Sequence, residues 1–462
     1  MSATKFPSRP RLATAILLGL VFAWWSVTCW VARDTRPWAI ELTTYLFGFS
    51  LFVSYFAAWA IRFIWCRGNR RRVAFRAVAA TMVFVLMTLI VELPAVVGLV
   101  DYGRWWESLI GEWRGPARNF LVDLDLGYRR SPNLHMVGYC TGDIAGGWNM
   151  PRQYSRELEF TFNAQGFRSR SEYTFADVVT LGDSYIEGWH VSDGETCSDK
   201  LAELTGLSVA NLAQSGYGTL QELHMFERHG LELSPRLVVW FFYEGNDLYD
   251  DESFENAVSF YRTHGLPKAH RLELLSWAQF SRASFSANLF RWVRRLADPL
   301  APNNMPYFGW FSENQGDRQR ILFSSECMSD LSEWERGRFE KSKDAFVTGK
   351  ALCDEHGILL LVCYIPTKFR VVGEWCEFSE SSPCQQWRLW NLPDRFAKFC
   401  SEKDIPFLDL TSPMQEAAAA GRLLYAAPDT HWDRAGHAFV AELLAQKCRD
   451  YGITSRRQSP ND

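Results

Sequence analysis

Three long apolar segments lie within the first hundred residues of the chain. Leu12 to Ala32 and Leu42 to Ile61 contain no charged residue, and Ala77 to Val100 contains only Glu92. Each segment is close to the roughly 20 residues that a helix needs to cross a bilayer. A cleaved signal peptide accounts for the first segment only, and buried helices of a soluble domain are the other alternative. The pattern predicts three transmembrane helices within residues 12–100, after a short tail of residues 1–11.

Arginine and lysine are distributed unevenly around these segments. The connection after the second segment holds Arg62, Arg67, Arg70, Arg71, Arg72 and Arg76. The connection after the first holds only Arg33 and Arg36, with Asp34 between them, and the tail holds Lys5, Arg9 and Arg11. Positive residues favour the cytoplasmic side of a membrane. The tail is therefore predicted to be cytoplasmic and the chain after residue 100 extracytoplasmic, in a protein of the plasma (inner) membrane.

Glu92 allows two interpretations. An acid inside a membrane span is often functional, whereas a carboxylate near the end of a span, here with Pro94 beside it, commonly lies at the membrane interface. We favour the interface and keep the functional acid as the alternative.

After residue 175, short apolar runs alternate with stretches of helical periodicity. The predicted strands are Val178 to Leu181, Ser208 to Leu212, Leu237 to Tyr243, Ile358 to Tyr364 and Pro406 to Leu410. The predicted helices are Asp199 to Leu204, Leu220 to His229, Leu331 to Glu355, Gln386 to Lys403 and Ala435 to Cys448. This alternation is typical of an α/β fold with a parallel sheet covered on both faces. Ligands of such sheets bind at the carboxyl ends of the strands.

Two regions depart from this alternation. Residues 101–175 are predicted to be a linker and a small β-rich region, with a strand at Glu157 to Phe162. Residues 250–330 are an insertion that delays the helix after the third strand. Aromatic residues recur in it at roughly helical spacing: Trp277, Phe280, Phe285, Phe290 and Trp292. The insertion is either a lid or wall of the site or a packing subdomain. The α/β domain then spans residues 176–451, and residues 452–462 are a tail.

The composition narrows the functional classes. Hydrophobic residues make up 47% of the chain, and the net charge of −4 argues against non-specific nucleic-acid binding. The sequence has no phosphate-binding loop, no zinc-ligand spacing and no dinucleotide fingerprint, so we expect no metal and no cofactor. Two of the eleven cysteines, Cys376 and Cys384, flank a short loop and are either a disulfide, which an extracytoplasmic location permits, or free thiols.

Four short motifs carry the candidate chemistry. Ser184 ends the motif Gly182-Asp183-Ser184 directly after the first strand. Gly216 and Asn246 follow the second and third strands, and Asp429 stands two residues before His431 in the last motif. Ester cleavage needs a nucleophile, a base, a group that orients the base, and hydrogen-bond donors for the oxyanion.

Each role has a candidate residue. Ser184 is the candidate nucleophile and His431 is its base. Residues two apart in an extended segment face the same side, so Asp429 is predicted to orient His431. The backbone N–H groups of Ser184 and Gly216 and the side-chain amide of Asn246 are the candidate oxyanion donors.

These residues also have purely structural interpretations. Ser184 is alternatively an N-cap, Asn246 an Asx turn, and His431 a surface histidine. His437 is a rival base, but its position inside a predicted helix favours packing or capping. Lys368, after the fourth strand, is either a contact to an anionic substrate or, as we favour, an exposed lysine.

Together and in this order, the four motifs resemble those of the SGNH (GDSL) hydrolase superfamily. The resemblance covers roughly Asp177 to Tyr451 and implies a three-layer fold with a five-stranded parallel sheet. It also implies a serine nucleophile, a histidine base, an acid and two further oxyanion-hole residues at Ser184, His431, Asp429, Gly216 and Asn246.

The position of the acid departs from the common family pattern. Many members place it three residues before the histidine, whereas Asp429 lies two residues before His431. The segment Asp429-Thr430-His431-Trp432 resembles the alginate O-acetyltransferase-like branch. In that branch, however, the Asp-x-His pair precedes the serine, so hydrolysis and transfer both stay open.

The leading interpretation is a membrane-anchored, extracytoplasmic serine esterase. Its substrate would be an O-acyl ester, acetyl above all, of a small molecule or a cell-surface glycan. The first alternative is an O-acyltransferase that acetylates an exported polysaccharide and needs a membrane partner for its acyl groups. The second is an inactive carbohydrate-binding or assembly protein, against which the intact Ser184, Asn246 and His431 argue.

The arginine asymmetry predicts the membrane topology. A reporter that is active only in the periplasm should be active when fused after Tyr102 and inactive when fused after Asn69, because the arginine-rich connection stays in the cytoplasm. Measuring both fusions in intact cells checks this. The reversed pattern would place the α/β domain in the cytoplasm and remove the case for a surface glycan.

Overall fold

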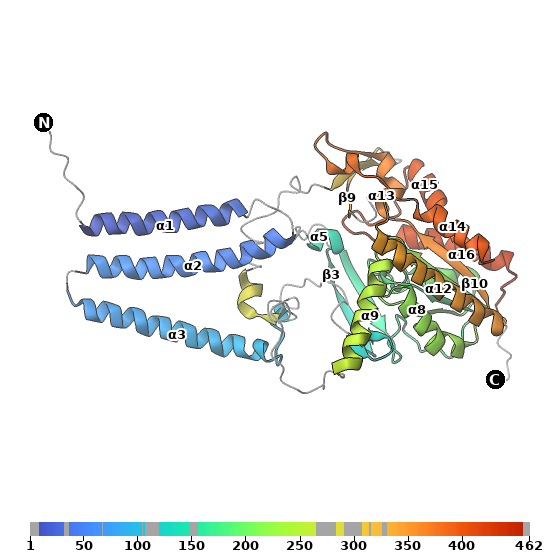
Figure 1. Cartoon of the computed structure of the whole chain (residues 1–462), viewed down its shortest axis with the longest axis horizontal. Helices are drawn as coiled ribbons and strands as arrows, with labels where there is room; N and C mark the ends of the chain where they lie inside the picture. Colours follow the sequence, from blue (N-terminus) through green and yellow to red (C-terminus); the bar gives the residue numbers. More distant parts are fainter. Residues whose placement is uncertain are drawn as a thin grey trace. The chain divides into compact units, whose positions relative to one another are not determined.

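The structure is a computed structural model of the whole chain (Figure 1). It describes residues 9–31, 37–66, 68–103, 105–106, 120–147, 156–264, 283–290, 307–313, 316–325 and 330–455. The chain forms two compact units. The first comprises Met1–Glu112, Gly147–Pro151 and Ala269–Met305, and the second comprises Trp113–Gly146, Arg152–Lys268 and Pro306–Asp462.

Three long helices make up most of the first unit (Figure 1). They are α1 (Arg9–Val31), α2 (Pro37–Trp65) and α3 (Arg70–Val96). Each contains a stretch that is long and apolar enough to cross a membrane: Pro10–Cys29, Gly48–Trp65 and Arg70–Val96. No more than 11% of any of these stretches is buried inside the protein. The three apolar helices predicted from the sequence are therefore present, with apolar side chains facing outward as a bilayer requires.

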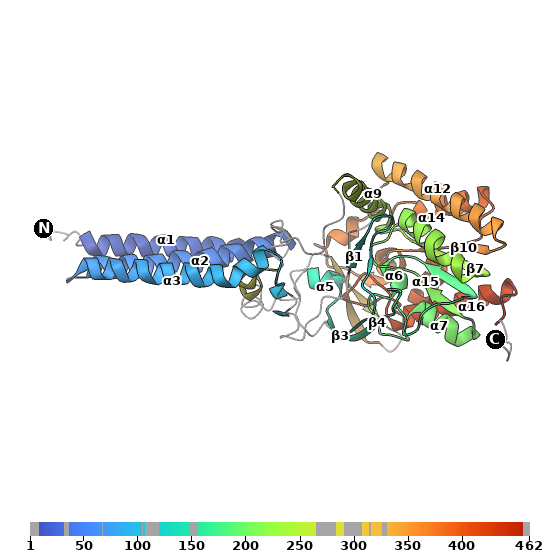
Figure 2. The same cartoon turned by 90° about the horizontal axis from the view of Figure 1, so that it is seen from below.

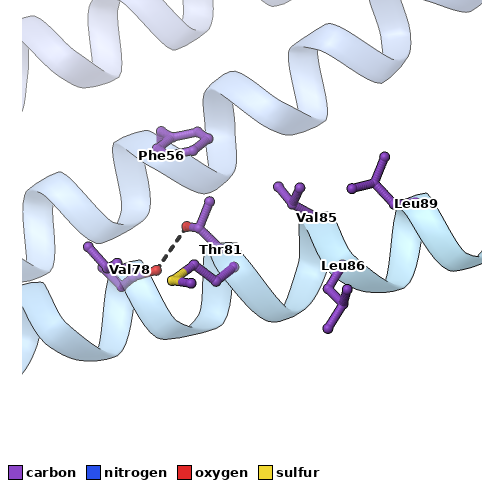
Figure 3. Close-up of a pocket in the computed structure, with 8 residues that line it drawn as sticks. Phe56, Val78, Thr81, Val85, Leu86 and Leu89 are labelled. Carbon is purple, nitrogen blue, oxygen red and sulfur yellow. Dashed lines mark hydrogen bonds between the residues drawn. The ribbon is translucent and has the colours of Figure 1, made fainter.

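The contacts between these helices are of two kinds. Between α1 and α2, Thr28 Oγ1 lies 2.8 Å from Ser50 Oγ, and Trp25 Nε1 donates to Ser54 Oγ at 3.0 Å. Between α2 and α3 lies a groove of about 480 Å³, lined by Phe56 and by apolar residues of α3 (Figure 3). Its one polar side chain, Thr81, donates to the carbonyl oxygen of Ala77 in its own helix, so the groove is apolar throughout.

Glu92, near the end of α3, binds the backbone of the predicted insertion. Its carboxylate accepts hydrogen bonds from Ser286 N at 2.6 Å and Phe285 N at 3.2 Å, where a short helix begins. A carboxylate at a helix N-terminus is favourable. Residues 283–290 thus pack within the first unit, and the role of the insertion as a whole stays a prediction. Trp277, Phe280 and Trp292 lie outside the described residues.

A five-stranded parallel sheet forms the centre of the second unit. Its strands are β5 (Val178–Leu181), β6 (Val209–Asn211), β7 (Leu237–Tyr243), β10 (Leu359–Ile365) and β12 (Phe407–Asp409), in the order β12-β10-β7-β5-β6. All five were predicted, and the α/β fold is confirmed. β6 lies on one side of β5, and β7, the next strand of this sheet along the chain, lies on the other side of β5. The carboxyl ends of β5 and β7 therefore flank the switch point where such folds bind ligands.

The sheet lies between two hydrophobic cores. Along β7, Val238, Trp240 and Phe242 belong to one core and the residues between them to the other. Helices α8 (Thr219–Met225), α12 (Glu333–Glu355) and α14 (Leu392–Glu402) contribute to the first core. Helices α7 (Cys197–Thr205), α15 (Thr411–Ala419) and α16 (Arg434–Asp450) contribute to the second. Figure 2 shows α12 and α14 on one side of the sheet and α7 and α16 on the other.

Shorter antiparallel pairs lie outside this sheet. β1 (Phe120–Asp123) pairs with β2 (Gly127–Arg130), and β3 (Leu134–Cys140) pairs with β4 (Arg156–Phe162), which contains the predicted strand. The short helix α5 (Asp143–Gly147) follows β3. A further sheet joins β8 (Phe308–Ser312), β9 (Arg318–Leu322) and β11 (Cys376–Glu377).

One expectation from the sequence was wrong. The helix after the third strand is not delayed, because α9 (Asp247–His264) begins directly beyond β7 with Asp247 and Asp250 in its first turn, where the helix dipole favours acids. Of the two alternatives left open for Cys376 and Cys384, the structure shows free thiols.

A buried ion pair joins the β-rich region to the sheet domain. Arg130, the last residue of β2, donates to the carboxylate of Glu187 at 2.6 Å and 2.5 Å, and both side chains are 0% exposed. The ring of Phe120 lies 4.2 Å from the guanidinium carbon. Since both charges are removed from water, losing one partner leaves the other buried and unpaired.

Glu187→Gln is therefore expected to lower the free energy of unfolding by about 3 kcal/mol or more, measured as a fall in the midpoint of thermal or urea unfolding. Asp354→Asn is the matched control, because its pair with Lys350 on α12 is exposed and contributes about 0.5 kcal/mol or less. Equal effects of the two substitutions would contradict the importance of burial.

Candidate active site

Ser184 is the first residue of the short helix α6 (Ser184–Glu187), directly after the turn that ends β5. The N-cap is Asp183, whose carboxylate accepts a hydrogen bond from Tyr185 N at 2.9 Å. A Cβ on Gly182 would lie 2.6 Å from the Ile186 side chain, so the tight turn needs glycine. The N-cap interpretation of Ser184 was therefore wrong, and its hydroxyl points to a partner elsewhere in the chain.

That partner is His431. Its Nε2 lies 2.7 Å from Ser184 Oγ, and its Nδ1 lies 2.5 Å from Asp429 Oδ1. His431 and Asp429 are buried, while Ser184 keeps partial exposure. The structure thus brings together the three residues that the sequence nominated, in a serine–histidine–carboxylate order that can pass a proton from hydroxyl to imidazole.

The backbone between Asp429 and His431 is bent, so the expectation of an extended segment was wrong. Asp429 Oδ1 accepts the backbone N–H of His431 at 2.8 Å in addition to its ring nitrogen. This is an Asx-type turn, in which an aspartate binds the backbone two residues on. The short spacing of acid and base works because one carboxylate oxygen reaches both the main chain and the ring of the same residue.

The carboxylate of Asp429 controls the protonation of His431. Burial alone would lower the pKa of His431, but the charge and hydrogen bond of Asp429 raise it to about 9. Burial opposes ionisation of Asp429, yet the facing His431 holds the pKa of that carboxyl well below its usual range. His431 is therefore a strong base that is neutral only at alkaline pH, and any reaction that needs it neutral should accelerate as the pH rises toward about 9.

Gly216 follows β6 and has a φ of +77°, a conformation that favours glycine. A Cβ at this position would lie 2.6 Å from the hydroxyl of Tyr128, and that hydroxyl donates to the carbonyl of Ser215 at 2.8 Å. Within the part of the chain that the structure describes, the backbone N–H groups of Ser184 and Gly216 have no hydrogen-bond acceptor. Both are available as donors at the carboxyl ends of neighbouring strands.

Asn246 lies between β7 and α9. Its amide nitrogen donates to Asp250 at 2.8 Å, while its amide oxygen is buried and has no hydrogen-bond partner among the described residues. The nitrogen carries a second hydrogen, which leaves one donor for a ligand. The catalytic and oxyanion roles of Ser184, Gly216, Asn246, Asp429 and His431 stay predictions.

Three residues near His431 were not found from the sequence. The hydroxyl of Tyr185 donates to the carbonyl of Thr430 at 2.6 Å, and its ring centroid is 4.7 Å from that of His431. His190 Nδ1 lies 3.5 Å from Asp429 Oδ2. The carboxylate of Asp143, from α5, accepts both the backbone N–H and the hydroxyl of Thr430. Tyr185 and His190 lie close to the serine motif in the sequence, but no sequence pattern marks Asp143.

His437 and Lys368 are structural. His437 Nδ1 accepts the N–H of Cys197, the first residue of α7, at 3.1 Å, and burial lowers its pKa to about 3, in agreement with the predicted capping role. The prediction that Lys368 is exposed was wrong. It is buried in α13 (Lys368–Val372), and its ammonium donates to the carbonyls of Leu322 and Ala426 at 2.9 Å and 2.8 Å.

One group among the described residues has ligand atoms close enough for a metal ion. Atoms of Asp143, Asp429 and His431 lie within 4.8 Å of one another. The 2.5 Å hydrogen bond from His431 to Asp429 occupies the two atoms that would have to face the ion. The arrangement therefore fits proton transfer better than metal binding.

Residues 318–460 match the family described as the SGNH hydrolase-like domain of the acetyltransferase AlgX. The matched region contains Asp429 and His431 and covers the last part of the sheet domain. Ser184 lies before the matched region. The resemblance to the SGNH superfamily, with its AlgX-like branch, is thereby confirmed. No curated protein matches the chain.

Several solved structures are similar to this chain at low sequence identity and low TM-score. A GDSL-like lipase from Bacteroides thetaiotaomicron is 14% identical with a TM-score of 0.30, over 59% of this chain and 88% of the other. A putative acylhydrolase from Bacteroides fragilis is 14% identical with a TM-score of 0.30, over 62% and 91%. A variant of an acetylxylan esterase from Geobacillus stearothermophilus is 12% identical with a TM-score of 0.30, over 61% and 96%. Because these identities and TM-scores are low, the resemblance to the SGNH superfamily rests on the family match.

The two histidines of the last motif are predicted to respond differently to removal. His431→Ala should lower kcat/KM for p-nitrophenyl acetate by about 10³-fold or more, because Ser184 loses its proton acceptor. His437→Ala should keep most activity but lower the melting temperature, because the first N–H of α7 loses its acceptor. Steady-state kinetics and thermal unfolding of both variants check this. If a folded His437→Ala protein lost turnover and His431→Ala kept it, the assignment of His431 as the base would be wrong.

Proposed function

We propose that the protein is a membrane-anchored serine esterase, because residues 318–460 match the family described as the SGNH hydrolase-like domain of the acetyltransferase AlgX. It hydrolyses O-acyl esters, acetyl esters above all, on glycans outside the cytoplasm. The observation that carries this proposal is the hydrogen-bonded series from Ser184 through His431 to Asp429, with distances of 2.7 Å and 2.5 Å.

In the first half of the reaction, His431 Nε2 takes the proton of Ser184 as Oγ attacks the acyl carbon. The ring becomes an imidazolium, which the carboxylate of Asp429 stabilises and orients through Nδ1. The oxyanion that forms accepts hydrogen bonds from the backbone of Ser184 and Gly216 and from the Asn246 amide. His431 then donates its proton to the departing sugar hydroxyl, which leaves an acyl group on Ser184.

In the second half, water replaces the sugar. The oxygen of the water attacks the acyl carbon while His431 takes a proton from that water. His431 then returns the proton to Ser184 Oγ, and the carboxylic acid leaves. Each half uses the same base and the same donors, so the resting site is restored without a cofactor.

The membrane anchor supports a substrate at the cell surface. Three apolar helices precede the sheet domain, and the arginine distribution favours an extracytoplasmic domain. Acylated glycans are accessible there. The acetylxylan esterase among the structural relatives acts on an acetylated polysaccharide by its name, which is in keeping with this substrate class.

Acyl transfer is the second candidate, and the family match favours it. The matched family is described by an acetyltransferase, and transfer differs from hydrolysis only in the group that attacks acyl-Ser184. A glycan hydroxyl would replace the water. Transfer would also need a membrane partner that delivers acyl groups. An inactive binding protein is a weaker alternative, because it has no need of the short contacts around His431.

The nucleophile is the most direct test. In full-length protein in detergent micelles, Ser184→Ala should lower hydrolysis of p-nitrophenyl acetate by about 10³-fold or more while the protein stays folded. A serine-reactive phosphonate should label the wild type at Ser184, as shown by peptide mass spectrometry. Ser253→Ala is the matched control, because Ser253 is exposed on α9 and its hydroxyl donates to the carbonyl of Tyr249 in the same helix.

The acceptor separates hydrolysis from transfer. With an acetylated donor and a deacetylated glycan, an esterase releases acetate at a rate that the glycan does not change, whereas a transferase forms acetylated glycan. Undiminished turnover in Ser184→Ala would remove both enzyme proposals.

A further inference from the structure

A segment far from the motifs packs directly against the Asp429 turn. The backbone N–H of Ala145, in α5, donates to the carbonyl of Pro428 at 3.0 Å, and Asp143 N donates to Asp429 Oδ2 at 2.7 Å. Gly142 has a φ of +89°, and a Cβ there would lie 2.9 Å from Asp429 Oδ2. The approach is so close that residue 142 has to be glycine.

The side chain of Asp143 completes this contact. Its Oδ1 accepts the backbone N–H of Thr430 at 2.8 Å, and its Oδ2 accepts the Thr430 hydroxyl. Thr430 is the residue between Asp429 and His431. The main chain of Asp143 therefore binds the acid while its side chain binds the residue beside it, and the turn that presents His431 is held from outside the motif.

Asp143 also places a second negative charge near the ring. Its Oδ2 lies 3.9 Å from His431 Nδ1, within the range in which opposite charges stabilise each other. Asp429 and Asp183 are the other acids that raise the pKa of His431. His190, on the far oxygen of Asp429, is buried, and burial lowers its pKa, so it adds little positive charge.

We propose that Asp143 is a positioning residue of the site, which fixes the Asp429–His431 turn through Thr430 and adds a second carboxylate beside the imidazole. The effect of Asp143 on catalysis rests on the proposed function, whereas its contacts do not. When His431 takes the proton of Ser184, the carboxylate of Asp143 adds to those of Asp429 and Asp183 in stabilising the new imidazolium. The side chain of Asp143 is 35% exposed, so its charge acts through a partly solvated path and is weaker than that of Asp429.

The charge and the hydrogen bonds of Asp143 can be separated. In Asp143→Asn, the amide oxygen still accepts the Thr430 N–H, but the charge is gone. The midpoint of the His431 titration should then fall by about one pH unit. At a pH above this midpoint, where the ring is neutral in both proteins, kcat/KM should fall by up to about tenfold as the imidazolium loses stabilisation. Thr430→Val is the matched control. It removes the hydroxyl that contacts both Asp143 and, at 3.3 Å, His431 Nδ1, but it keeps the charge, so the His431 midpoint should move much less than in Asp143→Asn.

The titration is read without turnover. Full-length protein in micelles is labelled with ¹³C at histidine Cε1, and the His431 resonance is identified by its loss in His431→Gln. Thermal unfolding shows that each variant is folded. If Asp143→Asn does not fold, Asp143→Ser removes the same charge and is titrated in its place.

The outcomes are distinct. A lower midpoint in the charge-removing variant, with a clearly smaller shift in Thr430→Val, supports the proposal. An unchanged midpoint in a folded charge-removing variant overturns it, as does an equal shift in Thr430→Val. Failure of the proposed function gives a different result. The wild type would then hydrolyse no ester, while the His431 midpoint would still shift in Asp143→Asn.

Discussion

The buried ion pair between Arg130 and Glu187 ties together the parts of the chain that make the candidate site. Glu187 lies one helical turn after Ser184 on α6, and its carboxylate also accepts the hydroxyl of Ser215, directly before Gly216. One carboxylate therefore sets the distance between the turn that follows β5 and the loop that follows β6. Arg130 supplies the opposite charge from β2, outside the sheet domain. A buried carboxylate without that partner would be costly, so the β-rich region is part of the site's framework.

A second set of polar contacts fixes the loop that carries the base. Lys368 Nζ donates to the carbonyls of Ala426 and Leu322, and Tyr185 binds the carbonyl of Thr430. Asp143 binds the same residue from the opposite direction. Each is a hydrogen bond between buried or partly buried groups, which is expensive to leave unmade. The imidazole is thus held in one orientation before any substrate arrives, and such preorganisation is what general-base catalysis requires.

Much of this protein follows from its sequence alone. The three apolar segments give three helices, because about 20 apolar residues have few other stable environments. Alternating strand and helix periods give the parallel sheet, because a strand apolar on both sides must be covered on both faces. The turn at Gly182-Asp183-Ser184 and the short spacing from Asp429 to His431 are local, so the sequence also indicates the candidate chemistry. Local patterns report local structure, and these features depend on little else.

Tertiary structure decided the rest. Asp143 and Thr430 are 287 residues apart in sequence, and no periodicity or motif predicts that a loop after β3 meets the loop before α16. Lys368 is buried because three carbonyl groups converge on its ammonium, and a lone lysine in a sequence gives no sign of that. The bend at Asp429 replaced the expected extended segment because its carboxylate binds the main chain two residues on. Such contacts depend on which surfaces the completed fold brings together, and single-residue patterns carry no record of them.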